Sequence, residues 1–208
     1  MKHRLNLDTW NRKEHYGFFK QFDQPYYGVN VTVDCSIAYK KSKQLGVPFY
    51  NYYLHKCLLV INEIENFKLR IEDDEVWLYD VINASCTVLR EDKTFGFSYM
   101  KFDPDFEVFN TIACEEIARV KQTNGLFTAE PLPNIIHFSA LPWVNFTSIT
   151  QASHSKFADS CPKFSIGKVY GESGKKLFSI AVHVHHALVD GYHLGLFYDR
   201  LQLLMNEE

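Results

Sequence analysis

The stretch His183-Val-His-His-Ala-Leu-Val-Asp-Gly-Tyr-His193 contains four of the nine histidines of this 208-residue chain. Histidines gathered in this way can bind a metal, pack in a core or supply one catalytic base. The residues leading up to His185 alternate as in a strand. This places His183 and His185 on one face of that strand and directs His186 to the other. The stretch therefore predicts the end of a strand and raises the question of which histidine carries chemistry.

A metal site is one alternative. An H-x-H pair on one strand face can begin such a site, and Asp190 or His193 could add a ligand. The spacing matches no zinc pattern, so we expect no metal. Taken singly, His183 and His185 are better explained as strand-end residues, and His193 as a packing residue in the first turn of the last helix.

His186 differs because an acid and a glycine follow it, at Asp190 and Gly191. Glycine permits a tight backbone turn, and the helix that begins there presents the positive end of its dipole. A histidine at the mouth of such a turn can be held in one orientation. Imidazole groups in general titrate near neutral pH, which suits a histidine to act as a general base.

The composition is that of a folded globular protein, with 46% hydrophobic and 23% charged residues. We expect one domain over residues 1–208, because no linker, repeat or change of composition divides the chain. Aromatic residues reach 15%, which favours a large core, an aromatic pocket or a buried interface. The formal net charge of −3 gives no reason to expect a nucleic acid or an anionic membrane as partner.

The location expected from the sequence is the cytoplasm. Residues 1–10 contain no apolar secretory segment, and no stretch is apolar enough to span a bilayer. The five cysteines are odd in number, widely spaced and without a CxxC pair, which favours reduced thiols.

The hydrophobic periodicity predicts an α/β protein: a two-layer sandwich with a mixed, largely antiparallel sheet and helices packed on it. Asp8 can cap the first helix and Pro48 can open the second. Helices are expected at 8–22, 48–67, 104–121 and 191–205. Strands are expected at 28–35, 85–90, 94–100, 134–140, 164–170 and 176–185, together with a hairpin over 67–80 that turns at Asp73-Asp74.

Three motifs resemble the chloramphenicol acetyltransferase family. HHALVDG at 185–191 resembles its HHxxxDG signature, which also occurs in other coenzyme A-dependent acyltransferases and in peptide-synthetase condensation domains. SALPWVNF at 139–146 resembles a family segment almost letter for letter, and WNRKEH at 10–15 is similar to the family's W-x-R-x-x-H. Because the order, the separation and the total length also match, the resemblance covers essentially the whole chain.

The resemblance implies a direct transfer from acetyl-CoA without an acyl-enzyme. The second histidine of the signature is the family's base, which corresponds to His186. Ser139 matches the serine that hydrogen-bonds the oxyanion, and losing such a donor typically costs about 10²–10³ in rate. Ser165 lies where the family usually has threonine, whose hydroxyl supports the transition state through water.

Further site residues follow from the same resemblance. Asp190 could be read as the acid of a catalytic triad, but the family pairs this aspartate with an arginine that matches Arg12. The pair braces the turn and orients the histidine indirectly. Trp143 and Lys168 match positions near the coenzyme A channel. The family is a homotrimer with active sites between subunits, so the expected partners are further copies of the chain and a small-molecule acceptor.

The acceptor pocket departs from the family pattern. Its matching residues are Phe18, Phe19, Phe95, Phe97, Phe127 and Gln151. Phe19 replaces a pocket tyrosine, Phe97 replaces a small residue of the better known members, and Gln151 replaces an apolar one. A hydroxyl lost from a polar pocket can change selectivity by orders of magnitude.

The expected function is acetylation of a hydroxyl of chloramphenicol, an antibiotic-resistance activity. The alternatives are the same chemistry on another hydroxylated small molecule, a dihydrolipoamide acyltransferase domain and a catalytically silent trimeric binding protein. His185 disfavours the second, since that family commonly has Asp before its base. The joint presence of His186, Ser139 and Ser165 disfavours the third, because a silent protein has no chemical need for all of them.

Overall fold

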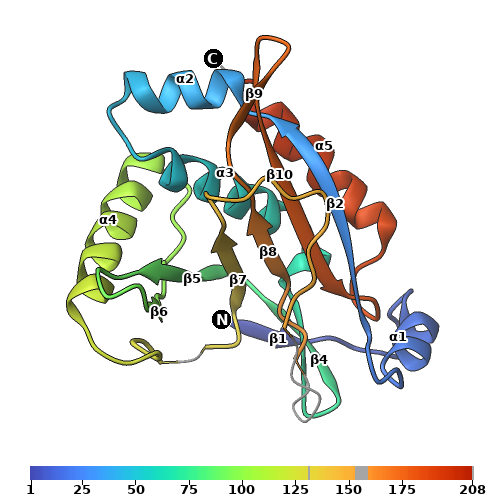
Figure 1. Cartoon of the computed structure of the whole chain (residues 1–208). Helices are drawn as coiled ribbons and strands as arrows, with labels where there is room; N and C mark the ends of the chain where they lie inside the picture. The colour runs from blue at the N-terminus through green and yellow to red at the C-terminus, as the bar shows by residue number, and fades with distance from the viewer. Residues whose placement is uncertain (131, 153–158, 208) are drawn as a thin grey trace.

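The computed structural model describes residues 1–130, 132–152 and 159–207 (Figure 1). A seven-stranded sheet forms its centre, in the order β2-β10-β8-β7-β5-β6, with the short β9 paired to β10. Its strands are β2 (Tyr26–Asp34), β5 (Asn83–Leu89), β6 (Phe95–Phe97), β7 (Ile135–Ala140), β8 (Lys163–Ile166), β9 (Tyr170–Glu172) and β10 (Lys175–His185). Strand β7 runs parallel to β5 and β8, and the other pairs are antiparallel.

Helices cover one face of this sheet. They are α2 (Ser36–Gln44), α3 (Phe49–Glu63), α4 (Phe106–Gln122) and α5 (Gly191–Met205), with a 3-10 turn, η1 (Glu65–Lys68), after α3. Helix α1 (Lys13–Phe19) lies apart from them, near one end of β2 in Figure 1. Aromatic contacts join the layers: Phe138 of β7 lies against Tyr53 of α3, and Phe164 of β8 lies against Phe197 of α5. The predicted mixed α/β sandwich is confirmed.

A second, three-stranded sheet in the order β1-β4-β3 lies beside the N-terminus. It contains β1 (Lys2–Arg4), β3 (Leu69–Glu72) and β4 (Glu75–Tyr79). The hairpin of β3 and β4 turns at Asp73 and Asp74, both with positive φ, as a two-residue hairpin turn of this kind requires. This confirms the predicted hairpin. The exposed strand β1 carried no signal, since three residues are too short to show periodicity.

The N-terminal prediction was wrong in extent. Helix α1 covers only Lys13–Phe19, and Arg12 occupies its N-cap position, whereas a helix over 8–22 capped by Asp8 was predicted. Asn6 and Asp8 form local bonds instead: Asn6 Oδ1 accepts from the Asp8 amide, and Asp8 pairs with Lys13. Short polar side chains that bond to the nearby backbone favour turns over helix.

Other boundaries shifted as well. Helix α2 was not predicted, because its sequence SIAYKKSKQ is largely polar and places few apolar residues at helical spacing. The helix predicted at 48–67 ends at Glu63, and the strand predicted at 164–170 divides into β8 and β9. Helix α5 begins and ends where predicted.

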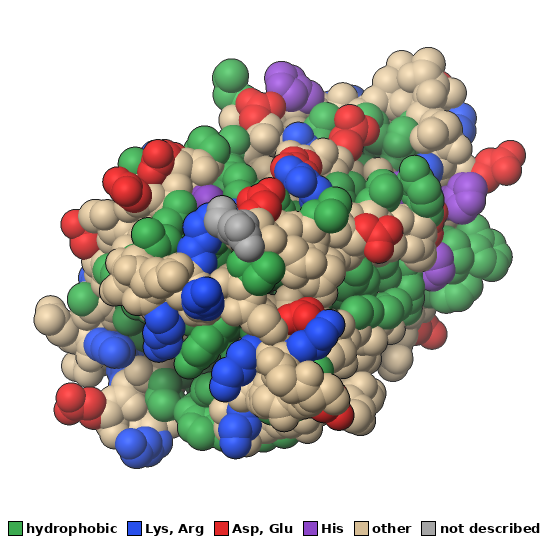
Figure 2. Space-filling view, turned by 90° about the horizontal axis from the view of Figure 1, so that it is seen from above, with side chains coloured by type: hydrophobic (Ala, Val, Ile, Leu, Met, Phe, Trp, Pro, Cys, Tyr) green, Lys and Arg blue, Asp and Glu red, His purple; other side chains and the backbone are tan. Residues whose placement is uncertain are grey.

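The surface has no dominant charge on the face seen in Figure 2, where acidic and basic side chains both occur among apolar ones. No helix in the described part of the chain is long and apolar enough to cross a membrane. The five cysteines, all within the described ranges, are free thiols.

Candidate active site

A row of hydroxyls crosses the sheet on the face turned away from the helices. Ser139 is the register partner of Ser165, and Ser165 is the partner of Ala181 on β10. On the other side, Thr87 Oγ1 of β5 lies 3.4 Å from Ser139 Oγ, and Thr87 is in turn the partner of Phe97. Register partners face the same side of a sheet, so the hydroxyls of Thr87, Ser139 and Ser165 lie side by side. Thr87 was not predicted from the sequence, because only strand pairing brings β5 beside β7.

The segment that follows β7 reaches back to this row and crosses in front of the sheet in Figure 1. Gln151 Nε2 donates a hydrogen bond of 2.6 Å to Ser165 Oγ. Ser165 is only 1% exposed, so this bond provides a partner for a nearly buried hydroxyl. The structure thus joins two residues that the sequence analysis assigned to different parts of the site.

His186 lies just beyond the end of β10, between two aromatic rings. Its imidazole stacks on Phe19 with the ring centroids 3.9 Å apart and the planes 9° apart, and Tyr27 lies at 4.4 Å. Its backbone amide donates to the carbonyl of Pro25 at 2.8 Å. Nδ1 is buried without a partner among the described residues. The ring is partly exposed, so Nε2 is the nitrogen left for a substrate.

Arg12 and Asp190 form a nearly buried ion pair beside this turn. Arg12 Nη1 lies 2.5 Å from Asp190 Oδ2, and Arg12 is 8% exposed. Burial alone would raise the pKa of Asp190, but the hydrogen bond from Arg12 and the nearby charges of His193 and Arg12 outweigh it and lower this pKa. The same carboxylate caps α5 by accepting from the Tyr192 amide.

The other histidines of the stretch have structural surroundings. His193 completes a capping box with Asp190, which is a more specific role than the packing predicted for it. His185 is buried, accepts a hydrogen bond from the Ala187 amide, and has its pKa lowered to about 4 by burial. The ring of His183 lies across Gly28, where an added Cβ would meet it at 2.4 Å.

His186 and Ser139 do not meet within one chain. Ala181, which lies in the hydroxyl row, precedes His186 by five residues, so about 16 Å of strand separates that row from the imidazole. Ser139 is displaced by two further strand spacings of about 4.8 Å each. The predicted base and the predicted oxyanion donor therefore belong to two separate half-sites.

The predicted pocket aromatics divide in the same way. Phe18 and Phe19 contact each other beside His186, with centroids 5.0 Å apart. Phe97 contacts both Phe95 and Phe127 near the hydroxyl row, at 5.5 and 5.7 Å. Phe127 is 74% exposed and Phe18 is 59% exposed, so each half-site presents apolar surface that a single chain leaves uncovered.

The two residues predicted near coenzyme A lie on neighbouring segments. Trp143 is exposed in the turn after β7, and Lys168 is exposed just after β8. The Lys168 amide donates to the carbonyl of Val144 at 2.8 Å, which holds the two segments together. This pairing presents an exposed indole ring and an exposed ammonium group on adjacent segments.

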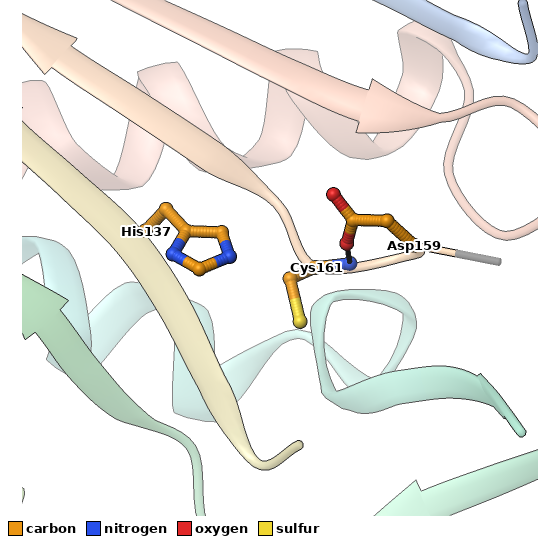
Figure 3. A group of neighbouring side chains, drawn as sticks. All are labelled: His137, Asp159 and Cys161. Carbon is orange, nitrogen blue, oxygen red and sulfur yellow. Dashed lines mark hydrogen bonds between the residues drawn. The ribbon is translucent and has the colours of Figure 1, made fainter. Parts of the chain in front are cut away.

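Sequence reasoning missed a group of three neighbouring side chains (Figure 3), one of which lies on β7 two residues before Ser139. Ligand atoms of His137, Asp159 and Cys161 lie within 4.8 Å of one another. Asp159 is already paired with Lys163 at 2.7 Å and accepts from the Cys161 amide. Burial raises the pKa of the Cys161 thiol. A protonated thiol and a neighbouring ammonium oppose a second cation, so the group is better described as a partly buried ion-pair cluster than as a metal centre.

Comparison with known proteins identifies the family of the chain. The family described as chloramphenicol acetyltransferase matches residues 2–202. A chloramphenicol acetyltransferase of Proteus mirabilis is 31% identical over 98% of this chain and 94% of its own length, and one of Klebsiella is 30% identical over 98% and 93%. A solved chloramphenicol acetyltransferase superposes with a TM-score of 0.93 at 30% identity, over 99% of this chain and 100% of that one.

More distant structures share the fold alone. A probable dihydrolipoamide acetyltransferase of Listeria monocytogenes superposes with a TM-score of 0.66 at 11% identity, over 98% of this chain and 93% of that one. The fold and the matches define the chain as an acyltransferase enzyme. More specifically, it belongs to the chloramphenicol acetyltransferase family.

Proposed function

We propose that this enzyme transfers the acetyl group of acetyl-CoA to a hydroxyl of chloramphenicol, an activity that would confer resistance to the antibiotic. The observation that carries the proposal is the placement of His186, whose ring is held between Phe19 and Tyr27 beside the Arg12–Asp190 pair. The family relationship supports the same activity. We further propose one acyltransferase domain over residues 1–208 and, since all five cysteines are free thiols, a reducing cytoplasmic location.

The reaction proceeds in two steps. His186 Nε2 takes the proton of the acceptor hydroxyl as its oxygen attacks the thioester carbonyl, and Ser139 donates a hydrogen bond to the resulting oxyanion. Ser165 supports this state through a water. Collapse of the tetrahedral intermediate breaks the carbon–sulfur bond, and the imidazolium returns its proton to the coenzyme A thiolate. The two substrates bound together supply much of the rate, and no metal ion is needed.

The working enzyme is a homotrimer with its sites between subunits. The separation of about 16 Å along β10 between the hydroxyl row and His186 supports this arrangement, because only a second copy can bring Ser139 to the imidazole. The aromatic side chains exposed in each half-site would be covered in the same way. Trp143 and Lys168 line the entry of coenzyme A.

Arg12 and Asp190 brace the turn and act on catalysis through His186. Phe18 and Phe19 from one subunit, with Phe95, Phe97, Phe127 and Gln151 from its neighbour, surround the acceptor. The hydrogen bond from Gln151 to Ser165 supports a polar acceptor pocket, which favours a second candidate: the same transfer to another hydroxylated small molecule.

The first test measures coenzyme A thiol release from acetyl-CoA by the purified protein, with and without chloramphenicol. We expect rapid release that requires chloramphenicol and is lost in His186→Ala. His3 is exposed and distant in sequence from His186, so His3→Ala should behave as the wild type. Release by His186→Ala at a wild-type rate would contradict the base assignment. Release only with another hydroxylated acceptor would favour the second candidate.

A further inference from the structure

We infer that Gln151 is a positioning residue that orients the hydroxyl of Ser165 for acetyl transfer. The inference rests on the proposed function, because it assigns a role within the same reaction site. Gln151 lies in the segment after β7, and its Nε2 donates a hydrogen bond of 2.6 Å to Ser165 Oγ on β8. The bond therefore links a loop side chain to a residue of the central sheet.

The surroundings of Ser165 leave little else to orient its hydroxyl. The residue is 1% exposed, and its register neighbours on the two adjoining strands are Ser139 and Ala181. The strand pairing fixes its backbone, so the remaining freedom is rotation about χ1, which has three staggered states. A short hydrogen bond from Gln151 selects one of them.

The polarity of the bond matters for the reaction. A serine hydroxyl carries one hydrogen and can accept at two lone pairs. Because Gln151 donates to the oxygen, the hydrogen of Ser165 stays free to bond a water or the substrate. A transition state that develops an oxyanion needs donors, and Gln151 keeps Ser165 in that role.

This bond also connects two departures from the family pattern. Threonine is usual at position 165 and an apolar residue at position 151. The branched Cβ of threonine restricts χ1 by itself, whereas serine lacks that methyl group. In this chain the amide of Gln151 supplies the restriction that the missing methyl group would give. Ser165 and Gln151 thus form one coupled substitution.

A double-mutant cycle tests the coupling, with thiol release from acetyl-CoA and chloramphenicol as the assay. The proteins are the wild type, Gln151→Leu, Ser165→Thr and the double variant. We expect Gln151→Leu to lower kcat about 5- to 10-fold, the effect of one hydrogen bond, without changing KM for acetyl-CoA. In the Ser165→Thr background, Gln151→Leu should lower kcat by less than about 2-fold. Gln151→Asn, whose shorter side chain cannot reach Ser165, should resemble Gln151→Leu.

The exposed Gln44→Leu on α2 is the matched control, and the thermal unfolding midpoint of every variant is measured alongside. If Gln151 had a structural role alone, Gln151→Leu would lower kcat equally with Ser165 and with Thr at that position. That result, or no loss of kcat in Gln151→Leu, overturns the inference. Either result leaves the proposed function standing. A wild type that releases no thiol with chloramphenicol overturns the proposed function, and this inference with it.

Discussion

At the residue scale, aromatic contacts and not a carboxylate orient His186. In a serine-protease type of triad, an aspartate would hold Nδ1 of the histidine. Here Asp190 is engaged by Arg12, by the Tyr192 amide and by His193, and it makes no hydrogen bond to His186 among the described residues. The carboxylate therefore fixes the start of α5, and through it the turn that carries His186, the proposed base.

Replacing Asp190 should therefore harm stability and activity together. Asp190→Asn leaves the Arg12 guanidinium nearly buried without its counter-charge, which typically costs about 3–5 kcal/mol. The change should appear as a lower midpoint in urea unfolding together with slower thiol release. A variant of unchanged stability that has lost activity would instead indicate a direct catalytic role for Asp190.

The buried His185 should make stability depend on pH. Its folded pKa is lowered to about 4 by burial, whereas an unfolded histidine has a pKa of about 6.5. The unfolded state therefore binds the proton first. Stability is full above pH 6.5 and falls as the pH drops towards 4, by about 3 kcal/mol in all.

Unfolding by urea at several pH values checks this expectation. His185→Asn retains an acceptor for the Ala187 amide but cannot titrate, so its stability should change less between pH 6.5 and 4. The exposed His3→Ala should keep the dependence of the wild type. An identical pH slope in His185→Asn and the wild type would show that another group is responsible.

At the element scale, the long pair of β2 and β10 accommodates the His183 ring only because Gly28 lies opposite it. Gly28→Ala would place a Cβ 2.4 Å from the ring and displace it, at a cost of about 1–3 kcal/mol. Thermal unfolding measures this loss. His183→Ala in the same protein removes the obstruction, so the double variant should recover much of it. If the stability losses of Gly28→Ala and His183→Ala simply add in the double variant, the contact between Gly28 and the His183 ring is contradicted.

Elements were predictable where local signals agreed. Helix α5 has a capping aspartate, a glycine at its start and a periodic apolar face, and its bounds were predicted correctly. The polar α2 lacks an apolar stripe, and it is stabilised by packing on α3 and β10 that no local pattern reveals. At α1, the side chains of Asn6 and Asp8 bond locally and shorten the helix that periodicity predicted.

At the scale of the whole molecule, the division of the site leads to a mixing experiment. If the site combines His186 of one subunit with Ser139 of the next, neither His186→Ala nor Ser139→Ala alone has an intact site. Trimers refolded from an equal mixture of the two variants should regain about one quarter of the wild-type sites, since each interface needs the right chain on both sides. Refolded samples of each variant alone are the controls. Mixtures no more active than these controls would place the whole site within one chain.

The sequence by itself determined the α/β class, most of the strands and helices, and the residue types from which a histidine-based acyl transfer is proposed. These features depend on local periodicity, turn chemistry and side-chain identity, which are present in every short window of the chain. The tertiary structure decided which of these residues lie together. Pairing of β7 with β8 set Ser139 beside Ser165, a loop brought Gln151 to Ser165, and the length of β10 kept His186 apart from both. Such long-range contacts depend on strand order and register, and the free energy that fixes them comes from burying the whole sheet against its helices.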